Sequence, residues 1–172
     1  MGIALARLPA QAVNLIIYTG RIAPGDGAKF YGALDPDAPA NAPRWLTFID
    51  ENADFSDIPL TAYVQTKHVL IPKLKRMSER PGYCSGVVCS TAHCEMVTSF
   101  WRHYVERDPD YVSHPVFFTN LKDACDWLKL PDAGCQAIAE AIAAQHIKDP
   151  PAPRPGRAGG GHEAAASASN DD

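Results

Sequence analysis

Short apolar runs alternate with longer stretches of helical periodicity along this chain, and this alternation limits the possible folds more than any other feature. The runs are rich in Val, Ile, Phe and Tyr, which predicts strands at residues 12–18, 44–50, 83–89 and 116–119. Helical stretches separate them, so right-handed crossovers between largely buried strands are expected. We therefore predict an α/β sandwich with a mostly parallel or mixed sheet of four to five strands and about four to five helices.

Signals at the ends of the helical stretches place the helices. A short helix is expected at residues 26–34, before a Pro-rich stretch. A long helix is expected to begin after Asp57, which resembles an N-cap, and to be kinked or split at Pro72. Further helices are predicted at residues 90–105, 120–128 and 132–147.

The chain has 172 residues, enough for one domain with some excess. We expect residues 1–11 to lead into the domain, residues 12–148 to form it, and residues 149–172 to be a disordered tail. The tail is rich in Pro, Gly and Ala and contains no large apolar side chain. It therefore cannot bury enough surface to offset the entropy lost on ordering.

Charge, hydropathy and cysteine usage narrow the class of protein. The 16 basic and 20 acidic side chains give a net charge of −4, which does not favour binding to nucleic acid. No run approaches the roughly 18–20 apolar residues of a membrane span, and the first residues lack the pattern of a secretory signal. An odd number of cysteines without an export signal favours reduced thiols. We therefore expect a cytoplasmic protein.

Short sequence motifs accompany each predicted strand. The first strand ends in Tyr18-Thr19-Gly20-Arg21-Ile22, and the second leads into Asp54-Phe55-Ser56-Asp57. The third contains Gly86-Val87-Val88-Cys89, and the pattern LxxAxxWL at residues 121–128 follows the last. Together these motifs, between residues 14 and 130, resemble the STAS domain of bacterial anti-sigma-factor antagonists, and more closely its divergent SpoIIAA-like branch.

The resemblance implies a non-enzymatic signalling or scaffold protein that binds a protein partner, such as a regulatory kinase. It also implies control by phosphorylation at the start of the helix after the central strand, where an added phosphate changes a docking surface. The family's Asp-Ser-Ser-Gly motif is absent there, so Ser56 and Thr61 remain as displaced candidates. The alternative is that Ser56 or Asp57 only caps the helix.

A basic group on the long predicted helix is a candidate for the docking face. It consists of Lys67, Lys73, Lys75, Arg76 and Arg80, five cations within fourteen residues. Such a group favours an acidic partner or an anionic head group. The alternative is an ordinary solvated helix face.

The densest polar chemistry lies at a strand-to-helix junction that contains Cys89 and His93. A thiol at a helix N-terminus gains thiolate character, so one hypothesis is a thiol-dependent enzyme with Cys89 as nucleophile and His93 as base. The alternative is that Cys89 packs in the core. The spacing of Cys84, Cys89, His93 and Cys94 matches no recognised zinc pattern, and we predict neither a metal nor a cofactor.

Large aromatic side chains suggest a further function, the binding of a small apolar or lipid-like ligand. We expect a pocket for it to be lined by Tyr31, Trp45, Phe55, Tyr63 and Trp101. The STAS-like fold permits such a pocket. Partner binding, ligand binding and thiol chemistry thus remain as three hypotheses, with partner binding preferred.

Overall fold

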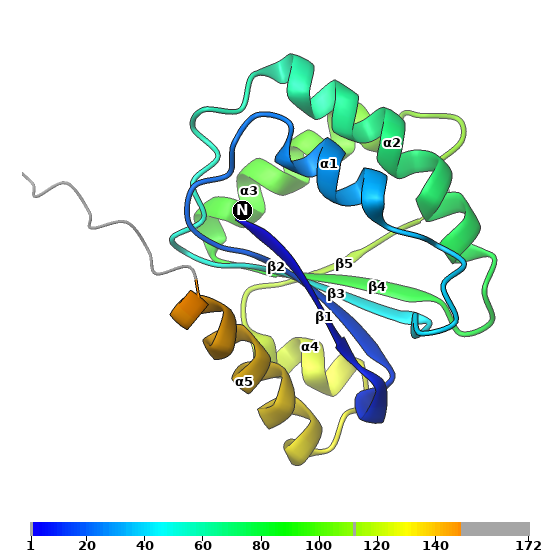
Figure 1. The fold of residues 1–172 in the computed structure, drawn as a ribbon, viewed down its shortest axis with the longest axis vertical. Helices are drawn as coiled ribbons and strands as arrows, with labels where there is room; N and C mark the ends of the chain where they lie inside the picture. The colour runs from blue at the N-terminus through cyan, green and yellow to red at the C-terminus, as the bar shows by residue number, and fades with distance from the viewer. Residues whose placement is uncertain (1, 112, 149–172) are drawn as a thin grey trace, which may run out of the picture.

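Five strands form a single sheet in the order β1-β2-β3-β4-β5, with helices on both of its faces (Figure 1). A computed structural model describes residues 2–111 and 113–148, without the side chains of Cys94, Trp101, Tyr104, Ile147 and Lys148. The strands are β1 (Ile3–Leu8), β2 (Val13–Tyr18), β3 (Arg44–Ile49), β4 (Cys84–Cys89) and β5 (Val116–Phe118). The α-helices are α1 (Asp26–Ala33), α2 (Leu60–Ser78), α3 (Thr91–Phe100), α4 (Leu121–Trp127) and α5 (Asp132–Lys148). Short helical turns follow β1, as η1 (Pro9–Gln11), and α3, as the π-helical η2 (Trp101–Val105).

Strand direction decides which helices cover which face. β1 runs antiparallel to β2, whereas β2, β3, β4 and β5 are parallel to their neighbours. Because crossovers between parallel strands are right-handed, a sheet that grows in one direction carries its connecting helices on one face. Figure 1 shows α1, α2 and α3 on this face, with α4 and α5 on the other. The predicted fold class, an α/β sandwich with a mixed sheet, is confirmed.

The central strands are apolar on both faces because each face has its own core. In β2, Leu15 and Ile17 pack against α4 and α5 in one core. Ile16 and Tyr18 point the other way, toward the core beneath α1 and α2. This double burial explains why the strands appear in the sequence as continuous apolar runs rather than as alternating ones.

The first strand lies within residues 1–11, where the sequence predicts only a lead-in. β1 pairs with β2 along its whole length, from Ile3 opposite Tyr18 to Leu8 opposite Val13. Ile3 packs into the core beneath α1 and α2, and Leu8 into the core on the opposite face. The folded unit therefore begins before residue 12, the predicted start of the domain. The predicted tail at residues 149–172 lies outside the described residues.

Helix α2 differs from the prediction in two ways. It is one continuous helix with Pro72 inside it, so of the two predicted effects of this proline the split is wrong, whereas the kink stays a prediction. A proline in a helix interior costs about 3 kcal/mol, but α2 buries four large apolar side chains at about 1.5–3 kcal/mol each, those of Leu70, Ile71, Leu74 and Met77. The N-cap position is Pro59 without a side-chain cap, so Asp57 does not serve as the cap.

The cysteines also differ from the prediction of reduced thiols. Cys125 of α4 and Cys135 of α5 form a disulfide, with their Cα atoms 5.7 Å apart. Both helices lie against the same sheet face, and the turn between them brings the two residues into bonding geometry. Disulfides are rare in a reducing cytosol, so this pair weighs against the cytoplasmic prediction.

Candidate functional site

A cavity of about 160 Å³ lies between the sheet and the layer of α1, α2 and α3. Its floor comes from strands β1 to β4, and its roof from the three helices and the segments that lead into them. The lining side chains are mostly aliphatic and aromatic. A cavity with these walls suits an apolar ligand, because water gains few hydrogen bonds there.

Strand register arranges the cavity floor in rows. Ile16 of β2 lies beside Thr47 of β3, which lies beside Val87 of β4. One row toward the carboxyl ends of the strands, Tyr18 lies beside Ile49. Side chains on one face of a strand recur at every second residue, so these positions all point into the same layer.

The roof is built from the apolar sides of the covering helices. Helix α1 contributes Tyr31, and α2 contributes Ala62 and Tyr63 from its first turns. The ring of Tyr63 contacts that of Phe100 in α3, with centroids 4.7 Å apart. This contact joins α2 to α3 above the cavity, and Phe55 closes the same end from the loop before α2.

Two buried hydroxyl pairs are the main polar groups of the wall. The hydroxyl oxygens of Tyr18 and Tyr31 lie 2.7 Å apart, and that of Tyr83 lies 2.9 Å from Oγ of Ser113. Burial raises the pKa of Tyr18 well above its usual value of 10.0, and burial likewise raises the pKa of Tyr31. Both phenols therefore keep their protons at neutral pH and act as neutral hydrogen-bonding groups.

The indole of Trp45 adds a third polar group at the cavity wall. Its side chain is only 4% exposed, and Nε1 has no hydrogen-bond partner within the described part of the chain. Among the described residues, no charged side chain lines the cavity. The site therefore lacks a counter-ion for a charged ligand, and burial of such a ligand here would be costly.

Four of the five residues predicted to line a ligand pocket lie together around this cavity: Tyr31, Trp45, Phe55 and Tyr63. The side chain of the fifth, Trp101, lies outside the described part of the structure. Sequence reasoning missed Tyr18 and Tyr83, which also line the cavity. Tyr18 had a usable signal, because it shares a strand face with Ile16 at two-residue spacing.

The geometry does not support the thiol hypothesis for Cys89. Its side chain is disulfide-bonded and 1% exposed, so it offers no free thiolate. His93 instead places Nδ1 3.3 Å from Oγ of Ser90 and contacts the ring of Phe55. The candidate nucleophile is therefore wrong. Among the described residues, Cys84 carries a free thiol, and burial raises the pKa of that thiol.

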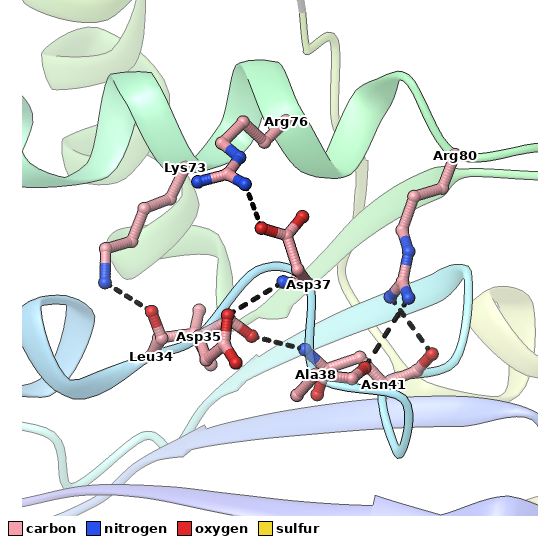
Figure 2. A network of polar contacts seen from close by, with 8 residues as sticks. All are labelled: Leu34, Asp35, Asp37, Ala38, Asn41, Lys73, Arg76 and Arg80. Carbon is pink, nitrogen blue, oxygen red and sulfur yellow. Dashed lines mark hydrogen bonds and ion pairs between the residues drawn. The ribbon is translucent and has the colours of Figure 1, made fainter.

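Three cations of the predicted docking group hold the loop between α1 and β3 (Figure 2). Nζ of Lys73 donates to the carbonyl oxygens of Gly32, at 2.8 Å, and Leu34. Arg76 pairs with Asp37, and Arg80 donates to the carbonyl oxygen of Asn41 at 3.2 Å. These residues therefore fasten residues 32–41 to α2.

The other two cations reach the segment after η2. Nζ of Lys67 lies 2.9 Å from Oδ2 of Asp108, and Nζ of Lys75 lies 3.3 Å from Oδ1 of Asp110. Every member of the predicted docking group thus has a partner within the chain. An acidic protein would have to compete with these contacts, so a docking role for the group stays a prediction that the geometry does not favour.

The candidate phosphorylation sites are both accessible. Ser56 is exposed in the loop before α2, where its backbone N–H donates to Oδ1 of Asp54 at 2.9 Å. Thr61 is exposed in the first turn of α2. Both hydroxyls lie in reach of a kinase, but nothing in the geometry distinguishes them from other surface hydroxyls.

The described residues contain neither a metal-binding cluster nor a membrane-spanning helix. No three His, Cys, Asp or Glu side chains come together there in a way that would hold a metal ion. None of the described helices combines the length and the apolar character that a membrane crossing needs. Comparison with known proteins found no matching family model, no matching curated protein and no matching solved structure.

Proposed function

We propose that this protein binds a small, mostly apolar molecule in the cavity between the sheet and helices α1 to α3. The observation that carries the proposal is the cavity itself, about 160 Å³ of space between mostly apolar walls beneath helices α1 to α3. Protein interiors usually contain few voids larger than a water molecule. This cavity is partly open to solvent, so a bound apolar ligand would remove apolar wall surface from water and stabilise the folded state.

The size of the cavity sets the scale of the ligand. An engineered apolar cavity of about 150 Å³ in another protein holds a benzene molecule. The cavity here, at about 160 Å³, therefore suits a ring-sized molecule better than a long acyl chain. Such a ligand would contact the floor at Thr47 and Val87 and the roof at Ala62.

Ligand binding in the cavity is also compatible with a signalling role of the protein. The STAS-like resemblance suggests that the domain passes information to a protein partner, and ligand occupancy is one way to control such an interaction. The preferred surface for a partner, the basic group on α2 and just after it, is weakened as a candidate because Lys73, Arg76 and Arg80 hold the chain's own loop. The cavity is therefore the better supported site.

The test fills the cavity and measures binding. Ala62→Leu adds three carbon atoms at a buried lining position of α2. Ala143→Leu makes the same change at an exposed position of α5 and is the matched control. Titration of ethylbenzene, followed by calorimetry, should show binding to the wild type and to Ala143→Leu, and at least tenfold weaker binding to Ala62→Leu. Equal affinity in all three proteins would reject the cavity as the site.

Native mass spectrometry provides a complementary test. Protein purified from its own host should carry an added mass of a small molecule, which the Ala62→Leu variant should lack. This measurement also helps to identify the ligand, because the mass difference gives its composition. Loss of the adduct from Ala143→Leu as well would indicate that the molecule binds elsewhere.

A further inference from the structure

The paired hydroxyls of Tyr18 and Tyr31 leave one hydrogen without an acceptor. Each phenol carries one hydrogen, and the bond between the two oxygens, 2.7 Å apart, uses only one of them. No second hydrogen-bond partner is found for either hydroxyl among the described residues. A buried donor without an acceptor is unfavourable by about 1–3 kcal/mol, so the pair favours any ligand that supplies one.

The indole of Trp45 is a further donor in the wall of the cavity. Nε1 of Trp45 is a donor only, and it too lacks an acceptor within the described part of the chain. In this conformation Nε1 has almost no accessible surface, so a ligand would reach it only after a side-chain shift. Of these two donors, the Tyr18–Tyr31 pair is therefore the one open to a ligand without such a shift.

From this wall we infer that the ligand is a neutral, ring-sized molecule with a carbonyl oxygen, and that this oxygen accepts the spare hydrogen of the Tyr18–Tyr31 pair. The inference rests on the proposed function and adds the chemical class of the ligand. Neutrality follows from the absence of charged side chains among the described lining residues. The carbonyl follows from the need for an acceptor beside a donor that has none.

The test uses two probes of nearly equal shape. Acetophenone carries a ring and a carbonyl, whereas ethylbenzene carries the same ring and no polar atom. The affinity ratio of the two probes cancels most of the contribution from shape and apolar contact. It is measured by calorimetry for the wild type, for the double variant Tyr18→Phe/Tyr31→Phe, and for the control Tyr111→Phe, which removes a phenol that does not line the cavity.

The preference for acetophenone should fall roughly three- to tenfold in the double variant, as expected for one net hydrogen bond. It should be unchanged in Tyr111→Phe, since that phenol lies outside the cavity. Each single variant, Tyr18→Phe or Tyr31→Phe, should keep most of the preference, because the remaining phenol can still donate. An unchanged ratio in the double variant, with both probes bound, would overturn the inference while leaving the proposed function intact.

Failure of the proposed function has a different signature, since neither probe would then bind the wild type. If the double variant does not fold, a measurement on the wild type alone still tests the proposed hydrogen bond. The infrared carbonyl stretch of bound acetophenone should lie below its frequency in hexane, because a phenolic donor weakens the C=O bond. A frequency equal to that in hexane would show a carbonyl without a donor and would reject the proposed contact.

Discussion

Nη1 of Arg44 lies 2.8 Å from the carbonyl oxygen of Leu128, which links the first residue of β3 to the end of α4. The same guanidinium donates to the carbonyl oxygens of Gln11 and Ala12 in the turn between β1 and β2. The last carbonyl groups of a helix have no partner within the helix, so a cation at this place satisfies one of them. One side chain thus holds the edge hairpin and the second helix layer to the centre of the sheet.

We predict that Arg44→Met destabilises the protein by about 2–3 kcal/mol, because carbonyl groups that are now paired with a charged donor lose it. The control is Arg107→Met, since Arg107 is exposed. Urea denaturation at neutral pH measures both changes. If the two variants unfold at the same urea concentration, the guanidinium has no stabilising role.

Leu128 itself provides a test of the second core. Its side chain is 5% exposed and packs with the buried residues of α4, α5 and the sheet. Leu128→Ala should cost about 2–5 kcal/mol, the usual range for a buried leucine. Leu60→Ala, at a leucine that is 53% exposed, should cost much less. A Leu128→Ala variant as stable as the wild type would show that α4 does not form an integral layer of the sandwich.

The disulfide between Cys125 and Cys135 should stabilise the protein because it lowers the conformational entropy of the unfolded chain. It joins residues separated by 10 positions, and a closed loop of this length corresponds to roughly 2–3 kcal/mol. Cys135→Ala should therefore lower the free energy of unfolding by about this amount under oxidising conditions, and addition of a reductant should remove the difference. Alkylation followed by mass spectrometry provides the check on the bond, because both sulfurs should resist iodoacetamide until they are reduced.

Hydrogen exchange distinguishes a structural role of Arg80 from a role in docking a partner. Arg80 donates to carbonyl oxygens in the loop before β3, and this loop has internal bonds from the N–H of Ala38 and of Asn41. Arg80→Met should speed exchange of these two amides by roughly three- to tenfold, in line with the loss of one hydrogen bond. Lys29→Met, at an exposed position of α1, should leave their exchange rates unchanged. Equal rates in wild type and Arg80→Met would leave the docking role as the better explanation of this side chain.

The fold could be predicted from the sequence where local signals and burial agree. The runs at residues 12–18, 44–50 and 83–89 are mostly apolar, and each contains a strand of the sheet. β1 was missed because Ala4 and Ala6 give it a weak strand signal, and its pairing with β2 is a tertiary contact. The predicted split at Pro72 was wrong for the opposite reason, since a strong local rule is outweighed by packing of the helix on the sheet.

The candidate site could be predicted only in part. Tyr31, Trp45 and Tyr63 stand out as large aromatic residues, and they do meet at one cavity. The two-residue spacing places Tyr18 on the same strand face as Ile16, but which helix layer covers that face is decided by the pairing of the strands, a tertiary contact. The partners of the α2 cations, such as Asp37 and Asp108, lie in distant loops and leave no local signal.

The last prediction concerns alkaline pH and the phenols of the cavity. Burial raises the pKa of both Tyr18 and Tyr31 above the value of about 10 that applies in an unfolded chain. Above that pH the unfolded state has lost these protons while the folded state keeps them, so the folded state binds more protons and stability falls as pH rises. The stabilisation is complete below pH 10 and is lost progressively above it.

Tyr18→Phe/Tyr31→Phe removes both titrating groups and keeps both rings. The difference in unfolding free energy between the wild type and this variant should therefore be constant from about pH 7 to 9 and should shift against the wild type above about pH 10. Urea denaturation at a series of pH values measures this difference, in which the contributions of the other tyrosines largely cancel. A constant difference across the whole range would mean that the two phenols ionise as readily in the folded protein as in the unfolded chain, which is incompatible with a buried hydroxyl pair 2.7 Å apart.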